Sequence, residues 1–133
     1  MKPTQRVVAA ALFDGEGRVL IAQRPAGKPL AGRWEFPGGK REARESERAA
    51  LVRELREELG IEVQAAQPLM QLTHAYEDRD VELSLWAVTR YRGAPRGLDG
   101  QALRWVLPAR LPEEDLLEAD LPFIPVLMAP RAL

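Results

Sequence analysis

Nine residues between Gly39 and Ile61 combine carboxylates, an arginine and glycines at a spacing that could support metal-assisted chemistry. Their order is G-x5-E-x7-R-E-U-x-E-E-x-G-U, where U is a bulky aliphatic residue, filled by Gly39, Glu45, Arg53, Glu54, Leu55, Glu57, Glu58, Gly60 and Ile61. On a helix, Glu54, Glu57 and Glu58 stand at i, i+3 and i+4, so their side chains converge. Like charges at this spacing repel, and a divalent cation would offset the repulsion. Carboxylate oxygens without a neighbouring histidine or thiol suit Mg²⁺, or alternatively Mn²⁺.

A solvated helix surface is the alternative, because glutamate and arginine are good helix formers that are common on exposed faces. The preceding Pro37-Gly38-Gly39-Lys40 favours a functional site. A glycine pair lets the backbone approach a ligand closely, and a carbonyl there can join metal coordination. Lys40 adds a positive charge suited to phosphate.

The carboxylates need a helix to hold them, and the sequence predicts one from about Ser46 to Leu59. Ser46 is a suitable N-cap, Glu47 stands in the first turn, and Gly60 provides the C-terminal stop. Leu51, Val52, Leu55 and Leu59 fall on an arc separate from the glutamates, so this arc should pack on the core.

Strands are predicted around this helix. Arg6–Phe13 and Arg18–Gln23 flank the turn Asp14–Gly17, and the proline- and glycine-rich stretch Arg24–Arg33 reads as a long loop. Trp34–Phe36 is a short extended segment.

The second half of the chain continues the pattern. Leu69–Ala75, Val81–Tyr91 and Ala102–Val106 are further strands, and Asp120-Leu121-Pro122 resembles the start of a final helix. The mixture predicts an α+β fold: one domain, residues 1–133, with a mixed β-sheet sandwiched between helices as an α/β/α sandwich.

Bulk properties narrow the possible functions. The chain has 133 residues, 46% hydrophobic and 29% charged, as in ordinary globular proteins, and its net charge of -1 provides no general attraction to nucleic acid or anionic membranes. It contains no cysteine, which excludes disulfides and thiolate chemistry. The apolar run Val7–Phe13 leads into a turn, so we interpret it as a buried strand rather than a signal peptide, and expect a cytoplasmic protein.

Residues 39–61 match the box of the Nudix hydrolases, and much of the chain resembles the MutT-type branch of that family. The resemblance extends to Gln23-Arg24-Pro25 and to residues 32–39. It implies the Nudix fold and magnesium-dependent cleavage of a nucleoside triphosphate into the monophosphate and pyrophosphate.

By motif position, the resemblance assigns metal binding to Glu54, Glu57 and Glu58, helped by the Gly38 carbonyl. Glu54 would also activate the attacking water. Glu45 and Arg53 would pair and fix the helix against the preceding loop.

The resemblance also suggests roles for residues outside the carboxylate helix, and most of them have an alternative interpretation. Lys40 and Arg24 would contact phosphates by the same resemblance, although Arg24 could equally be a surface arginine. Asp99 stands where many relatives bring an additional glutamate to the metal; as an aspartate before glycine it could also be a turn residue. Phe36 could pack against a base or belong to the core.

Asp120 stands where MutT-type enzymes often have an asparagine that reads a purine. An aspartate can accept from a guanine N–H edge and, if protonated, can also donate. It is equally suited to cap a helix, and relatives that act on pyrimidine triphosphates can also carry it. Arg79 lies in a predicted loop that could flank the base or be a simple turn charge.

By the same resemblance, the substrate that we expect is an oxidised guanine nucleotide such as 8-oxo-dGTP. This activity would make the protein a nucleotide-pool sanitiser serving DNA repair. The alternatives are hydrolysis of CTP or modified pyrimidine triphosphates, a non-catalytic nucleotide-sensing module, and a plain interaction domain. We expect a nucleoside triphosphate as the partner, no nucleic acid polymer and no membrane, and a monomer or homodimer.

Overall fold

Two β-sheets form the centre of the computed structural model, which describes residues 2–129. The four-stranded sheet has the order β4 (Gly38–Lys40), β1 (Thr4–Leu12), β6 (Asp80–Arg92) and β5 (Glu62–Ala75). β1 and β6 are parallel, whereas the β1–β4 and β5–β6 pairs are antiparallel. The second sheet is antiparallel, with the order β3 (Trp34–Glu35), β2 (Val19–Gln23) and β7 (Leu103–Val106).

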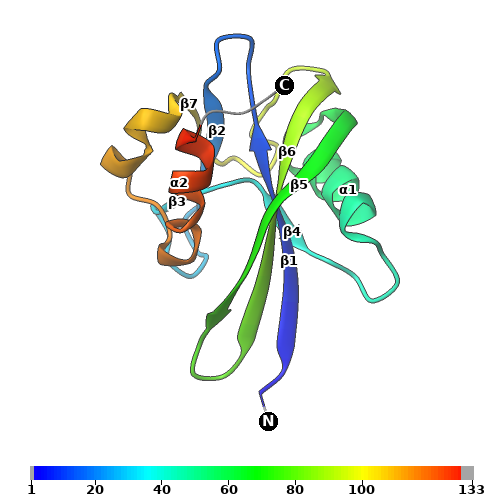
Figure 1. Cartoon of the computed structure of the whole chain (residues 1–133), viewed down its shortest axis with the longest axis vertical. Helices are drawn as coiled ribbons and strands as arrows, with labels where there is room; N and C mark the ends of the chain where they lie inside the picture. Colours follow the sequence, from blue (N-terminus) through cyan, green and yellow to red (C-terminus); the bar gives the residue numbers. More distant parts are fainter. Residues whose placement is uncertain (1, 130–133) are drawn as a thin grey trace.

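Helices cover both sides of the sheets (Figure 1). The helix α1 (Glu47–Leu59) lies on one side, and α2 (Phe123–Met128) lies on the other with the 3₁₀ helices η1 (Pro108–Glu113) and η2 (Glu118–Asp120). The predicted α+β architecture, a mixed sheet between helices, is confirmed. Among residues 2–129, no helix is long and apolar enough to cross a membrane.

β1 separates two hydrophobic clusters because its side chains alternate between its two faces. Val8, Ala10 and Leu12 pack in the cluster beneath α1, whereas Ala9 and Ala11 face the cluster that includes α2. A strand buried on both faces needs apolar residues at every position, which explains the continuous run from Val7 to Leu12.

α1 begins and ends as the sequence predicted. The Ser46 hydroxyl accepts from the Ala49 N–H at 3.1 Å, and Gly60 has the left-handed conformation (φ 70°) that ends the helix. Leu51, Leu55 and Leu59 are fully buried against the sheet, each stabilising the fold by about 1.5–3 kcal/mol. This packing places the neighbouring arc of the helix, with Glu54 and Glu58, against Gly38 and Gly39 of β4.

Other boundaries differ from the prediction. β5 begins at Glu62 rather than Leu69, and its pairing with β6 contains register shifts near Ala65 and Pro68, so no simple alternation marks its first half. η1 was not predicted. The last helix starts at Phe123, and its N-cap position is Pro122 rather than Asp120.

The segment Gly38–Lys40 forms a strand by pairing with β1, and Gly38 packs directly against the backbone of β1. Ala9 pairs with Gly38, and Val8 pairs with Gly39. A Cβ atom added to Gly38 would lie 2.0 Å from the Val8 carbonyl oxygen, a backbone atom that cannot move aside alone. Only glycine fits at this position.

The substitution Gly38→Ala should therefore destabilise the fold by about 2 kcal/mol, since the added methyl group must push β4 away from β1. Urea denaturation measures the loss. Gly15→Ala is the matched control, because a Cβ at Gly15 meets no atom within 4 Å. Equal stability of the two variants would contradict the close packing of β4 on β1.

Candidate functional site

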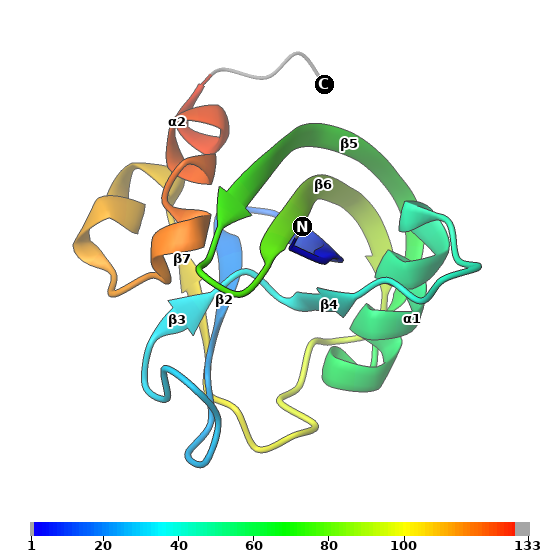
Figure 2. The ribbon, with the colours of Figure 1, turned by 90° about the horizontal axis from the view of Figure 1, so that it is seen from below.

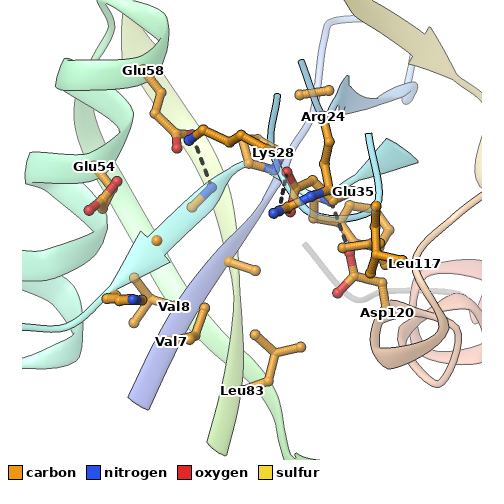
Figure 3. Close-up of a pocket in the computed structure, with 18 of the residues that line it drawn as sticks. Val7, Val8, Arg24, Lys28, Glu35, Glu54, Glu58, Leu83, Leu117 and Asp120 are labelled. Carbon is orange, nitrogen blue, oxygen red and sulfur yellow. Dashed lines mark hydrogen bonds and ion pairs between the residues drawn. The ribbon is translucent and has the colours of Figure 1, made fainter. Parts of the chain in front are cut away.

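A cavity of about 780 Å³ lies between α1, the Gly38–Lys40 strand and the second sheet. Figure 3 shows Glu54 and Glu58 on one side of it, with Arg24, Glu35 and Asp120 on the other. Of the predicted site residues, the cavity lining includes Arg24, Phe36, Gly38, Lys40, Glu54, Glu58, Arg79, Asp99 and Asp120. One concave site thus contains both the helix carboxylates and the residues predicted to contact the base.

Arg53 forms the central ion-pair network of the site. Its Nε and Nη2 donate to the two carboxylate oxygens of Glu45 at 2.7 and 2.8 Å, a bidentate pair. Nη1 donates to Glu54 at 2.9 Å and to Glu57 at 3.4 Å, and Nη2 also reaches the Lys40 carbonyl at 3.0 Å. The hydrogen bonds from Arg53 lower the pKa of Glu45 to about 2. Glu45 therefore stays ionised, and the loop before α1 is tied to the helix.

Gly39 makes room for Glu54. A Cβ atom on Gly39 would lie 2.3–2.6 Å from the carboxylate carbon and oxygens of Glu54, whose side chain is only 14% exposed. Burial raises the pKa of Glu54, Arg53 lowers it, and the charges on Glu57 and Glu45 raise it, with a net increase. Glu54 is thus a more basic carboxylate than an exposed glutamate.

Glu58 accepts a hydrogen bond from the Gly38 N–H at 3.3 Å (Figure 3). Its pKa is raised to about 8, first by burial and then by the negative charges of Glu54, Glu35 and Asp99. The ionised form is therefore disfavoured in a cavity that already contains other carboxylates. A positive charge placed among these groups would reverse that preference.

Glu57 is more exposed than its two neighbours, with 59% of its side chain accessible, and turns toward Arg53. Within residues 2–129, no group of three or more acidic or histidine side chains is arranged to enclose a metal ion. The donor set nevertheless fits a hard divalent cation. It consists of carboxylate oxygens, and the raised pKa values of Glu54 and Glu58 reflect repulsion and burial that a cation would offset.

On the opposite wall, Arg24 holds the proline-rich loop. Its Nε donates to the Pro29 carbonyl at 2.7 Å, and its Nη1 donates to both carboxylate oxygens of Glu35 at 3.1 and 3.2 Å. Burial raises the pKa of Glu35 although Arg24 opposes the shift. Arg24 therefore organises the cavity wall; its predicted contact with phosphate stays a prediction.

Asp120 is buried in η2, with only 5% of the residue exposed, and does not cap the helix that follows. Its Oδ2 accepts from the Phe36 N–H at 3.1 Å. Burial raises its pKa to about 7; the Phe36 N–H lowers it and the Glu35 charge raises it. Near neutral pH this carboxyl group is thus present in both accepting and donating forms.

The remaining predicted residues lie around the cavity. The Phe36 ring is buried and makes an edge contact with the Phe123 ring, with 6.2 Å between the ring centroids. It is the backbone N–H of Phe36 that contacts Asp120. Lys40 is exposed at the end of β4. The Arg79 guanidinium lies over the Tyr76 ring at 4.8 Å, at the tip of the β5–β6 hairpin.

Sequence reasoning missed several cavity residues, among them Glu35, Tyr76 and Gln101. Glu35 carried a usable signal, because it stands between Trp34 and Phe36 in an extended segment. Since alternate side chains of a strand face opposite sides, two core aromatics direct the residue between them toward the cavity. Tyr76 and Gln101 had no comparable local pattern.

The layers of the fold and the carboxylate cavity are those of a phosphoanhydride hydrolase. The chain matches the NUDIX domain model over residues 8–125 and belongs to that family. It is a Nudix hydrolase of the MutT type, a class that needs a divalent metal ion.

Two curated relatives come from Escherichia coli K12. A CTP pyrophosphohydrolase is 42% identical, with 94% of this chain and 93% of the relative covered. An 8-oxo-dGTP diphosphatase is 35% identical, with 93% and 95% covered. A solved MutT structure, from work on Aliivibrio salmonicida and Vibrio cholerae, has a TM-score of 0.83 and 35% identity and covers 94% of this chain and 97% of its own.

Gly39→Ala should leave the protein folded but reduce turnover by about 10²-fold, because the methyl group displaces the Glu54 carboxylate rather than backbone. Hydrolysis of a nucleoside triphosphate with a saturating divalent cation measures the loss, and thermal unfolding checks the fold. Gly15→Ala serves again as the control. Activity within a few-fold of the parent would show that Glu54 does not need this close approach.

Asp120→Asn should stabilise the fold more at pH 8 than at pH 5. The pKa of Asp120 rises from 3.8 to about 7 on folding, so the unfolded chain loses this proton first and parent stability falls as pH rises through that window. Asparagine keeps an acceptor for the Phe36 N–H and does not titrate. Urea denaturation of both proteins at the two pH values gives the difference; Glu58 titrates in both and cancels. A difference independent of pH would contradict the shifted pKa.

Proposed function

We propose that this protein is a magnesium-dependent nucleoside triphosphate pyrophosphohydrolase whose favoured substrate is 8-oxo-dGTP. One observation carries the proposal: a single cavity is lined by the half-buried glutamates of α1 and, on the opposite wall, by Asp120. A triphosphate placed along it would bring its phosphates to Glu54 and Glu58 and its base to Asp120. The proposal is supported by the chemistry of the two walls, with glutamates on α1 and the buried Asp120 opposite them.

At the phosphate end, Glu54, Glu57 and Glu58 would hold the metal ion, together with the Gly38 carbonyl and Asp99. The bound cation would neutralise charge on the phosphate oxygens and lower the pKa of a water molecule. Glu54 would accept the proton of the attacking water, a role that suits its raised pKa. Arg53 would keep Glu54 in place, and Lys40 and Arg24 would offset the remaining charge of the phosphates.

At the base end, Asp120 would face the edge of the base, and Arg79 with Tyr76 would form the adjoining wall. A protonated Asp120 can donate to the carbonyl of an oxidised purine, whereas the ionised form accepts from an N–H group. A carboxyl group whose pKa is about 7 provides both forms near neutral pH.

Hydrolysis of CTP is the second candidate, favoured by the 42% identity to a CTP pyrophosphohydrolase over nearly the whole of both chains. A small pyrimidine could occupy the same end of the cavity, since an ionised Asp120 can accept from the exocyclic amino group of cytosine. The two candidates differ in the base and share the phosphate chemistry.

Pyrophosphate release should be measured for 8-oxo-dGTP, dGTP, CTP and dCTP at one Mg²⁺ concentration. We expect kcat/KM for 8-oxo-dGTP to exceed that for dGTP by at least about 10-fold, roughly the discrimination that one well-placed polar contact provides. Glu54→Gln should lose turnover with every substrate, whereas Glu62→Gln, an exposed position on β5, should not. Equal rates for the two guanine nucleotides would refute pool sanitation, and a dominant rate with CTP would establish the second candidate.

A further inference from the structure

The segment between β6 and β7, residues 93–102, lies across the C-terminal end of α1 (Figure 2). The Arg96 N–H donates to the Leu59 carbonyl at 3.0 Å, and the Leu98 N–H donates to the Glu58 carbonyl at 3.1 Å. These carbonyls belong to the last turn of the helix, which has no partners within the helix for them. The segment is therefore fixed to the turn that carries Glu58.

Gln101 strengthens this attachment through both ends of its side-chain amide. Its Nε2 donates to the Glu58 carbonyl at 3.2 Å, and its Oε1 accepts from the Asp99 N–H at 2.9 Å. A carbonyl can only accept and a backbone N–H can only donate, so the two partners determine the orientation of the amide. Gln101 thus links the backbone of Glu58 directly to the backbone of Asp99.

Gly97 allows the chain to fold tightly around Gln101. A Cβ atom on Gly97 would lie 2.1 Å from the Gln101 carbonyl oxygen and 3.2 Å from its Oε1. This close packing leaves Gln101 half-buried beneath the turn, although Asp99 and Leu98 are exposed.

The hydrogen bonds of Gln101 hold Asp99 near Glu58, a group of the same charge when both are ionised. Asp99 and Glu58 line the same cavity, and the ionised forms of two carboxyl groups that face one cavity repel each other. An exposed aspartate on a surface turn would move away from such a neighbour unless its backbone were held. The amide of Gln101 provides that restraint and contributes no charge of its own.

We propose that Gln101 is a positioning residue that holds Asp99 beside Glu58 and thereby increases the affinity of the metal site. The inference rests on the proposed function, because it assumes that the two carboxylates share a divalent cation. Both ends of the Gln101 amide are bonded to the backbone of Glu58 and Asp99, so its proposed effect on the cation is exerted through these two residues. Groups that orient metal ligands in this way typically change metal affinity by about 10- to 100-fold.

Direct Mn²⁺ binding, followed by the electron paramagnetic resonance signal of the free ion, tests the proposal without turnover. Four proteins form a double-mutant cycle: the parent, Gln101→Leu, Asp99→Ala and the double variant. Gln101→Leu should raise the Kd by about 10-fold in the parent background but by less than about 2-fold when Asp99 is already alanine. Gln64→Ala, at an exposed glutamine on β5, should match the parent.

A second variant covers the case in which Gln101→Leu does not fold, as judged by circular dichroism. Gln101→Met keeps the length of the side chain and adds no charge but cannot donate to the Glu58 carbonyl, and it should weaken Mn²⁺ binding in the same Asp99-dependent way. Unchanged affinity, or an equal loss in both Asp99 backgrounds, would overturn the role of Gln101 while leaving the metal site intact. A parent that binds no Mn²⁺ would overturn the proposed metal site itself and this inference with it.

Discussion

The convergence of three glutamates on one face of α1 is the constraint on which the rest of the site depends. Their mutual repulsion opposes the folded arrangement, so the surrounding structure must supply compensating charge and hold the helix in place. Arg53 does both, because its guanidinium contacts Glu45, Glu54, Glu57 and the Lys40 carbonyl at once. A lysine has no planar fork and could not make these contacts together. The arginine of the motif is thus an architectural requirement of the carboxylate cluster.

One consequence is a set of neighbouring carboxylates with very different proton affinities. Arg53 lowers the pKa of Glu45 to about 2, whereas burial and like charges raise that of Glu58 to about 8. Without a cation, the ionisation of Glu58 opposes folding increasingly as pH rises from 4.5 to about 8, since the unfolded chain releases that proton first. Metal binding would displace this proton. The affinity of the site for a cation should therefore be coupled to pH through Glu58 more than through Glu45.

The sequence predicted α1 almost completely, because its start, its end and its buried face are all set by residues within the helix. Ser46, Gly60 and the leucines needed no information from the rest of the chain. The start of β5 and the β4 strand could not be located in this way, since they depend on pairing with distant partners and on the space beside Val8. Asp120 shows the same limit at a single residue. Local pattern indicated a helix cap, whereas its actual partner is the N–H of Phe36, distant in sequence.

The two walls of the cavity also differ in whether local or distant segments build them. This difference suggests how proteins that share the motif could differ in substrate. The carboxylate wall of the cavity is built mainly from one continuous segment, residues 38–61, whose internal contacts fix its geometry, and Asp99 joins it from the segment before β7. The opposite wall, where we propose that the base binds, is assembled from the loop after β2, the β5–β6 hairpin and η2. These segments meet only in the folded protein. Glu35 and Asp120 are coupled within that wall, since the charge of Glu35 raises the pKa of Asp120. If the base binds there as proposed, a change at either residue would alter which hydrogen-bonding edge the cavity accepts, because neither residue contacts Arg53. Substrate choice can therefore vary among proteins that share the motif, as the names of the relatives that hydrolyse CTP and 8-oxo-dGTP illustrate.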